Sequence, residues 1–163
     1  MKRKIAIVTG GGSGLGFAIA EKFVQNGIET IIAGRNKEKL DEAAEKLGAL
    51  CHAITCDLAD LGSIPGFVQT VIDQYGQIDI LVNNAGINMK KDFTEVTDEE
   101  FQQVITTNIT AVFSMSREVV KNMLQNVPRR RKQGKKEEKK RKMERILYSH
   151  MLIPSSLINS FTT

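Results

Sequence analysis

The residues with the clearest chemical potential lie near the start of the chain, in the run Thr9-Gly-Gly-Gly-Ser-Gly-Leu-Gly16. Glycines permit positive φ and leave no Cβ between the backbone and an approaching pyrophosphate, whose charge a following helix N-terminus favours. Phe17 stands where a mononucleotide P-loop has its lysine, which excludes that motif. The run therefore predicts a dinucleotide phosphate site, and the alternative is a tight strand-to-helix turn without a ligand.

The elements that must position this run alternate along the first 126 residues, as short apolar stretches and amphipathic stretches. We expect strands at residues 4–9, 29–33, 50–56 and 78–83, with helices between them. The third helix is expected at about 64–75, the fourth opens with a capping box from Thr97 to Glu100, and the fifth spans about 108–125. The predicted fold class is α/β, a Rossmann-like doubly wound parallel sheet with about four strands and five helices.

Size and composition limit the possibilities further. With 163 residues, 41% of them hydrophobic, the chain has the material for one domain. No stretch approaches the roughly 20 apolar residues of a membrane span, so we expect a cytoplasmic protein with no membrane partner. Cys51 and Cys56 match no metal or redox spacing, so we predict buried, reduced thiols and no metal site.

The net charge of +4 is concentrated in one segment. Residues 1–128 hold 12 Lys and Arg against 16 Asp and Glu, whereas residues 129–145 hold 11 against 3. We therefore divide the chain into a domain at 1–126 and a basic, irregular tail at 127–163, which we expect to be disordered. The positive net charge of the whole chain is therefore no evidence that the folded part binds nucleic acid.

The glycine run and a second motif, Leu81-Val82-Asn83-Asn84-Ala85-Gly86, resemble the two signatures of the short-chain dehydrogenase/reductase family. The resemblance covers about residues 4–126 and implies a Rossmann fold that moves a hydride between a nicotinamide and a carbonyl or alcohol. It also implies cofactor-binding roles for the glycine run, the ends of the second and third strands, and the Asn-Asn-Ala-Gly turn. The matching residues are Thr9, Gly10, Gly12, Ser13, Gly14, Leu15, Gly16, Arg35, Asp57, Leu58, Asn84, Ala85 and Gly86.

The end of the second strand bears on which nicotinamide dinucleotide is preferred. Folds that prefer NAD usually place a carboxylate there, about 20 residues past the glycines, to accept from the ribose 2′-OH. This chain has Gly34 followed by Arg35, whose guanidinium suits a 2′-phosphate. We therefore favour NADP(H) over NAD(H) as the partner, and the alternative is that Arg35 is a solvated surface residue.

The resemblance implies four catalytic residues, of which the chain matches one. Asn108 matches the asparagine that supports a proton relay, although it is also placed to cap the fifth helix, and both roles can hold. Asp79 and Leu152 stand four residues after the chain's two tyrosines, so neither begins the family's Tyr-x-x-x-Lys. The family's serine has no counterpart, because Ser114 and Ser116 fall within the fifth helix. We therefore expect a cofactor-binding half without dehydrogenase turnover.

The tail has three competing interpretations. It is a solvated run without a role, a nucleic-acid or anionic-surface binder, or the product of a frameshift that replaced the family's fifth strand onward. A nucleic-acid role is disfavoured because no aromatic residues interleave with the cations of residues 129–145. The frameshift interpretation rests on residue types with all-purine codons, and it predicts an unpaired edge at the fourth strand with exposed apolar helix faces.

Two further expectations concern substrate and assembly. Residues 86–91 and 96–101 are similar to bacterial sugar-acid dehydrogenases of the gluconate 5-dehydrogenase type. The fourth and fifth helices correspond to a dimer face in the family, so a homo-oligomer is one expectation. A non-catalytic module that binds a dinucleotide or a partner subunit is the rival to an enzyme.

Overall fold

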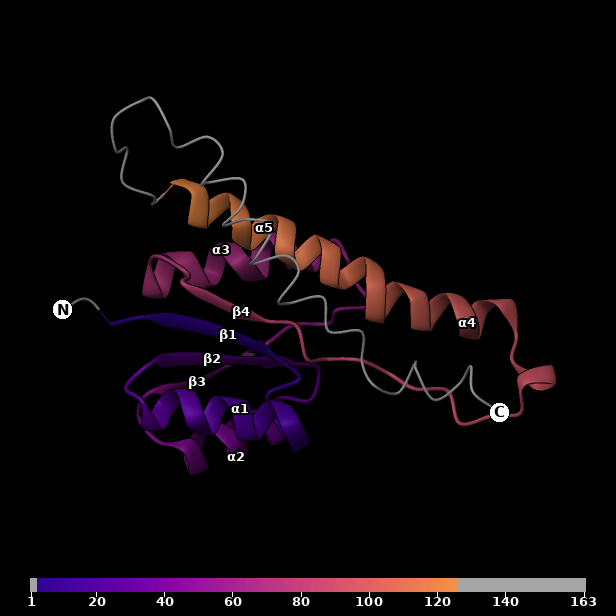
Figure 1. Ribbon diagram of the computed structural model, residues 1–163, viewed down its shortest axis with the longest axis horizontal. Helices are drawn as coiled ribbons and strands as arrows, with labels where there is room; N and C mark the ends of the chain where they lie inside the picture. Colours follow the sequence, from indigo (N-terminus) through magenta and orange to yellow (C-terminus); the bar gives the residue numbers. More distant parts are fainter. Residues whose placement is uncertain (1–2, 126–163) are drawn as a thin grey trace, which may run out of the picture.

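Residues 3–125 are described by the structure, a computed structural model, so the basic tail and the expected boundary near residue 126 lie outside the described part. Within it, four parallel strands form one sheet in the order β3-β2-β1-β4 (Figure 1). Ile7 on β1 lies between Ile31 on β2 and Leu81 on β4 in the register. The strands are β1 Ile5–Thr9, β2 Glu29–Gly34, β3 Cys51–Thr55 and β4 Ile80–Val82.

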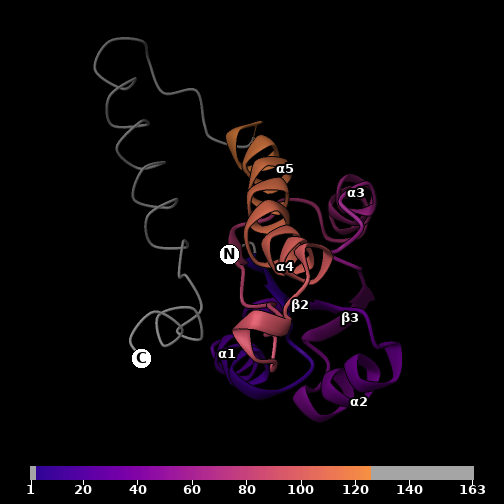
Figure 2. The ribbon, with the colours of Figure 1, turned by 90° about the vertical axis from the view of Figure 1, so that its right-hand side faces the viewer.

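Helices cover both faces of the sheet, which confirms the doubly wound α/β prediction (Figure 2). Helices α1 (Gly14–Gln25) and α2 (Lys37–Leu47) lie on one face. Helices α3 (Ser63–Tyr75) and α5 (Ala111–Gln125) pack together on the other. A short 3₁₀ turn at Phe93–Glu95, helix α4 (Asp98–Ile105) and the π-helical turn η2 (Thr106–Thr110) lead into α5.

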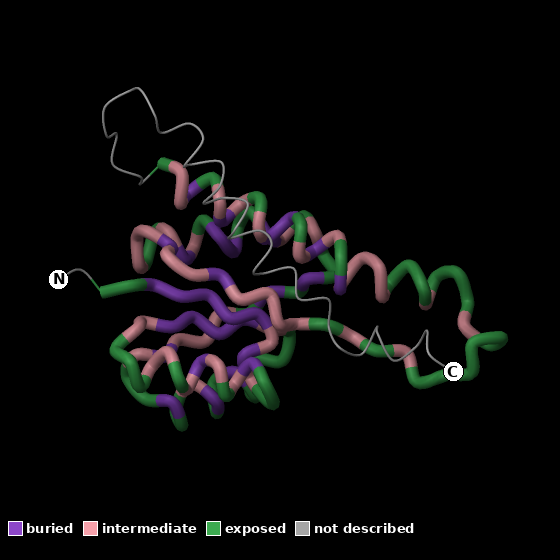
Figure 3. The backbone as a smooth tube through the Cα atoms, in the orientation of Figure 1, coloured by how far each residue is buried: buried purple, intermediate pink, exposed green. Residues whose placement is uncertain are grey.

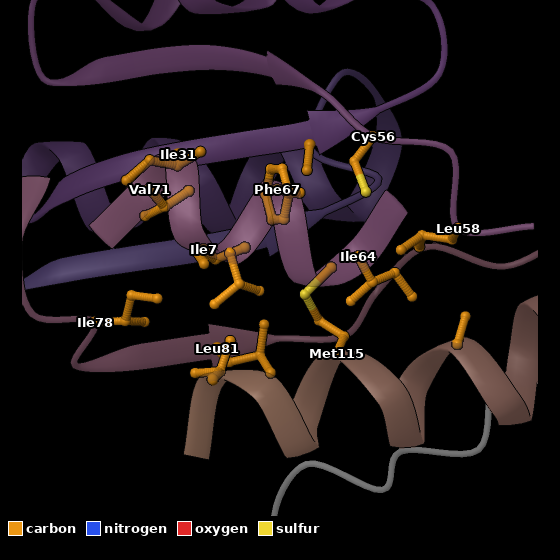
Figure 4. Packing of buried hydrophobic residues seen from close by; sticks show 14 of the residues in the cluster. Ile7, Ile31, Cys56, Leu58, Ile64, Phe67, Val71, Ile78, Leu81 and Met115 are labelled. Atoms are coloured by element: carbon orange, nitrogen blue, oxygen red, sulfur yellow. The ribbon is translucent and has the colours of Figure 1, made fainter. Parts of the chain in front are cut away.

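Alternation along the strands produces two cores, because successive side chains of a strand point to opposite faces. Ile7 and Ile31 pack under α3 and α5, whereas Val8 and Ile32 pack under α1 and α2. Burial is therefore concentrated in the strands and the inner helix faces (Figure 3). The larger cluster includes Cys56, Leu58, Ile64, Phe67, Val71, Ile78, Leu81 and Met115 (Figure 4).

Two predicted features fit closely. Thr97 and Glu100 form the expected capping box at the start of α4, with both reciprocal hydrogen bonds present. Cys51 and Cys56 are buried and form no disulfide, and burial raises the pKa of Cys51 to about 11. Both thiols are therefore core residues.

Two element boundaries differ from the expectation. The fourth strand was expected at residues 78–83 but is confined to Ile80–Val82, since the Ile78 N–H donates to the Asn122 side chain (3.0 Å) and not to a strand. Asn108 was expected to cap a new helix, yet it lies inside the π turn that joins α4 to α5 without a break.

In the described part of the chain, β4 is one edge of the sheet, with β3 at the other, and no strand pairs with the outer side of β4. The nearby helices expose large apolar side chains, with Phe101 59%, Ile109 53% and Phe113 64% exposed. The predicted open edge and uncovered apolar faces are therefore present within residues 3–125.

Candidate functional site

The expected site residues gather at the carboxyl end of the sheet, where β1, β2 and β4 finish beside one another. The chain passes from β1 to β2 on one side and reaches β4 on the other side of β1. Open parallel sheets bind ligands at such a reversal of strand order. The strand order therefore brings the glycine run and the Asn-Asn-Ala-Gly turn to one place.

Close packing explains why Gly16 and Gly10 are glycines. A Cβ added at Gly16 would lie 2.2 Å from the Gly10 carbonyl oxygen and 2.5 Å from the Asn84 side-chain nitrogen. A Cβ at Gly10 would lie 2.9 Å from the Ala85 Cα. These two positions hold the start of α1, the glycine turn and the second motif in direct contact.

Gly14 differs, since its environment is open. Its φ is +55°, which side chains rarely adopt, and a Cβ there would meet nothing within 4 Å. Ser13 before it is extended and its side chain makes no cap hydrogen bond to α1. Leu15 is 71% exposed. The start of α1 therefore has no side-chain cap and has open space beside Gly14, a cradle that fits the negative charge of a dinucleotide pyrophosphate.

Thr9 joins the two motifs. Its buried hydroxyl donates to the Val82 carbonyl (3.3 Å) and accepts from the backbone N–H groups of Asn84 (3.0 Å) and Ala85 (3.1 Å). The Asn84 side chain donates in return to the carbonyls of Thr9 (3.1 Å) and Gly10 (3.3 Å). A hydroxyl can donate one hydrogen bond and accept two, so the Thr9 hydroxyl makes every hydrogen bond it can. It thereby links β1 to the turn after β4.

Asn108 fixes the chain just beyond this turn. Its amide oxygen accepts from the Ile87 N–H (2.9 Å), and its amide nitrogen donates to the Ile87 carbonyl (2.9 Å). Single π turns inside α-helices occur frequently at functional sites, and here the turn contains Asn108. The side chain therefore clamps the loop after the Asn-Asn-Ala-Gly turn, in place of the expected cap role.

The ends of β2 and β3 carry the residues expected at the adenosine half. Asp57 accepts from the Ala59 N–H (3.0 Å) in a local turn, and Leu58 is buried. Arg35 is exposed, and with Asp57 it lines a cleft of about 430 Å³ between β3 and α3. Their roles toward a nucleotide, like those of Gly12, Ala85 and Gly86, stay predictions.

Tyr75 lies at the opposite end of the molecule. It ends α3, and its ring is 4.8 Å from the His52 ring, beside Glu29 at the amino end of β2. Burial, with the Glu29 carboxylate adding to it, raises the Tyr75 pKa. An acid-base tyrosine needs its pKa lowered toward neutrality, so Tyr75 has neither the place nor the environment for that chemistry.

Two contacts were not anticipated from the sequence. The Asn83 amide donates to the Ser116 hydroxyl on α5 (3.1 Å), and Ile87 is the partner of Asn108. No local pattern marks Ser116 or Ile87, because both contacts join segments more than 20 residues apart. In residues 3–125, none of the helices has the length and apolar character required to cross a bilayer.

Comparison with known proteins agrees with this geometry. The family model for short chain dehydrogenase matches residues 4–135. A 3alpha-hydroxysteroid dehydrogenase of Mediterraneibacter gnavus is 38% identical over 128 residues, which cover 76% of this chain and 51% of that protein. An uncharacterized oxidoreductase of Thermotoga maritima is 36% identical over 127 residues, covering 76% and 50%.

Solved structures match over the same share of this chain. The F189W actinorhodin polyketide ketoreductase with NADPH superposes with a TM-score of 0.72 at 34% identity, over 76% of this chain and 49% of that one. The 3-ketoacyl-(acyl-carrier-protein) reductase of Brucella melitensis, complexed with NADH, gives 0.72 at 31% identity, over 76% and 51%. The chain therefore spans about half the length of the proteins it matches.

Proposed function

The chain belongs to the short chain dehydrogenase family, and on that premise we propose that residues 4–125 bind a nicotinamide dinucleotide, with NADP(H) preferred over NAD(H). The observation that carries the proposal is the cradle at the start of α1. Gly16 and Gly10 allow close packing beneath the cradle, and Gly14 has no neighbour within 4 Å of an added Cβ. No side chain caps the amides at the start of α1. The relatives crystallised with NADPH and NADH support the same class of ligand.

The preference for NADP(H) rests on the end of β2. A Cβ at Gly34 would make only ordinary contacts, 3.7 Å or more from Leu40, so packing does not demand glycine there. Gly34 leaves the end of β2 without a carboxylate, and the exposed Arg35 follows it. A 2′-phosphate would therefore meet a cation where an acidic residue would repel it.

Titration calorimetry of the full chain with NADPH and NADH tests the proposal. We expect tighter binding of NADPH. Gly34→Asp should reverse the order and weaken NADPH by at least about tenfold, because like charges placed together cost several kcal/mol. Gly34→Ala is the matched control and should leave both affinities unchanged. Equal affinity of the native chain for both dinucleotides would contradict the proposed preference for NADP(H). No binding heat with either dinucleotide would contradict the proposed function.

A nicotinamide dinucleotide held by these residues would supply hydride chemistry toward a carbonyl or alcohol, a sugar acid included. The chain's own residues hold the dinucleotide and, through Asn108, fix the loop after the Asn-Asn-Ala-Gly turn. Neither tyrosine begins Tyr-x-x-x-Lys, and Tyr75 lies at the wrong end of the sheet. We therefore propose dinucleotide binding without turnover, and steady NADPH oxidation against a simple ketone would contradict it.

A second role, as a homo-oligomer, is favoured by the apolar side chains that α4, η2 and α5 expose. Phe101, Ile109 and Phe113 are each more than half exposed in the described chain. Sedimentation velocity should show a dimer that Phe113→Ser weakens and that Leu15→Ser, at an exposed apolar residue on α1, leaves intact. An isolated monomer should unfold with weak cooperativity, so a sharp, reversible melt of a monomeric sample would count against this role.

A further inference from the structure

The first turn of α2 lies directly against the glycine run. A Cβ added at Gly12 would be 3.4 Å from Leu40 Cδ2, 3.7 Å from the Lys39 carbonyl oxygen and 3.8 Å from the Leu40 nitrogen. Arg35, on the other side of the β2 end, lines the cleft beside β3. Because Gly12 follows β1 and β2 lies between β1 and β3, the Lys39 backbone lies on the β1 side of the β2 end and Arg35 lines the cleft on the β3 side.

The cations of this turn are not equally available. Lys37 is paired with Asp41 one helical turn later, and that carboxylate raises the Lys37 pKa. The Asn36 side chain is also engaged, since it accepts from the Lys39 N–H (2.8 Å) as the N-cap of α2. Lys39 is exposed, and its ammonium group forms no ion pair within residues 3–125. Lys39 is therefore the uncommitted cation of this turn.

The direction of the side chain supports a ligand role. In an α-helix each Cα–Cβ bond tilts toward the N-terminus, and α2 begins at the carboxyl end of the sheet, where β2 has just ended. The Lys39 side chain therefore leans toward the same end of the sheet as the cradle of α1. The positive end of the α2 dipole adds to the attraction for an anion there.

We propose that Lys39 is a specificity-determining residue for the 2′-phosphate of NADP(H), with Arg35 as the other cation. The inference rests on the proposed function, because it assigns a residue to the site proposed there. Arg35 offers a planar fork of donors and Lys39 a compact charge on a flexible stem, so the two approach a phosphate differently. Carboxylates oppose both cations: Glu38 is exposed on the same turn as Lys39, and Asp57 and Asp60 line the cleft beside Arg35.

The test is calorimetric binding of NADPH and NADH to the full chain and its variants. Lys39→Ala should weaken NADPH about fivefold, in the range of one exposed charge contact, and change NADH less than about twofold. Lys39→Arg should restore most of the NADPH affinity. Lys37→Ala is the matched control on the same turn and should change neither, since Lys37 is committed to Asp41. The Lys39 effect should shrink at high salt.

The outcomes separate this inference from the proposal beneath it. If Arg35→Ala and Gly34→Asp leave the NADPH to NADH ratio unchanged, the NADP(H) preference itself is wrong. If those variants change the ratio but Lys39→Ala weakens both dinucleotides equally, or neither, Lys39 does not read the 2′-phosphate. An equal loss in Lys37→Ala and Lys39→Ala would likewise overturn the inference, because it would show a general field effect of the helix.

Discussion

The two ends of the parallel sheet are built in opposite ways. At the amino end, two polar side chains satisfy the backbone, since Asp79 accepts from the Ile5 N–H (3.0 Å) and Asn122 accepts from the Ile78 N–H (3.0 Å). The side chains of Glu29 and His52 also pair with each other there, 3.1 Å apart. At the carboxyl end, Gly14 and Ser13 leave the α1 amides without a side-chain cap. The amino end is closed by the chain itself, and the carboxyl end is left for a ligand.

The residues that stabilise this domain and the residues that would bind a ligand are therefore largely at opposite ends of the sheet. Side-chain hydrogen bonds to backbone groups at the amino end remove the donors that a ligand would need. At the carboxyl end the bonds of Thr9 and Asn84 lie beneath the surface and hold the shape of the cradle without filling it. Changes at the amino end should therefore alter unfolding alone, whereas changes at the carboxyl end should alter binding, with or without stability.

Gly16→Ala should have the largest effect, because it should lower both the stability of the domain and its affinity for NADPH. The new methyl group would lie 2.2 Å from the Gly10 carbonyl oxygen, a backbone atom that cannot move without displacing the turn. We expect a loss of about 3 kcal/mol in the free energy of unfolding, at the upper end for overpacking, with loss of NADPH binding. Urea unfolding and calorimetry measure the two effects. Native-like stability and native-like NADPH affinity would contradict the close packing of Gly16 against Gly10.

Asn122→Ala should cost about 2 kcal/mol in unfolding free energy, since it leaves the Ile78 N–H without its acceptor. NADPH affinity, measured on the folded fraction, should stay within about twofold because the site is at the other end of the strands. Lys121→Ala, one residue away and exposed, is the control and should cost less than about 0.5 kcal/mol. A strong loss of affinity in Asn122→Ala would break the separation of the two ends.

Gly14→Ala and Gly27→Ala form a matched pair. Both glycines have positive φ, +55° and +73°, and an added Cβ would meet nothing within 4 Å at either. Each variant should lose about 1 kcal/mol from backbone strain. Only Gly14→Ala should weaken NADPH, by tenfold or more, since its methyl group would stand in the cradle. Equal affinities in the two variants would place the phosphates elsewhere.

Glu29→Gln should have the smallest effect. The Glu29 carboxylate lies 3.6 Å from Arg3 and 3.1 Å from His52, and all three side chains are partly exposed. Such pairs contribute at most about 1 kcal/mol, so thermal unfolding should shift by only a few degrees. NADPH binding should be unchanged. A measurable change in affinity would show that the two ends are coupled through β2.

Particular residues show how far sequence reasoning reached. The first three strands were predicted to within about one residue, because both faces of a parallel sheet are buried and its strands appear as apolar runs. Residues 78–83 were expected as one strand, but only Ile80–Val82 form one, and the Ile78 N–H donates to Asn122, 44 residues away. Hydrophobic pattern does not encode such a long-range partner.

The two motifs expected to form the site lie together in the structure, but the bonds that connect them were not predicted. The residues of the glycine run and the family resemblance of the Asn-Asn-Ala-Gly turn identified the two motifs, yet the Thr9 hydroxyl bridge between them depends on a strand order that only folding reveals. Asn108 was matched to the family's proton-relay asparagine and was also expected to cap the fifth helix. One surplus residue in a helical turn leaves no mark in the apolar pattern, so the π turn was not foreseen.

That turn has a consequence for how α4 and α5 can vary. A π turn holds one residue more than an α-helical turn, so deleting one residue between Thr106 and Thr110 would leave a regular α-helix that still joins α4 to α5 in phase. Met115 and Val119 should stay buried after such a deletion. The deletion should instead break the pair of hydrogen bonds between Asn108 and Ile87, so the surplus residue serves the loop after β4 and not the core.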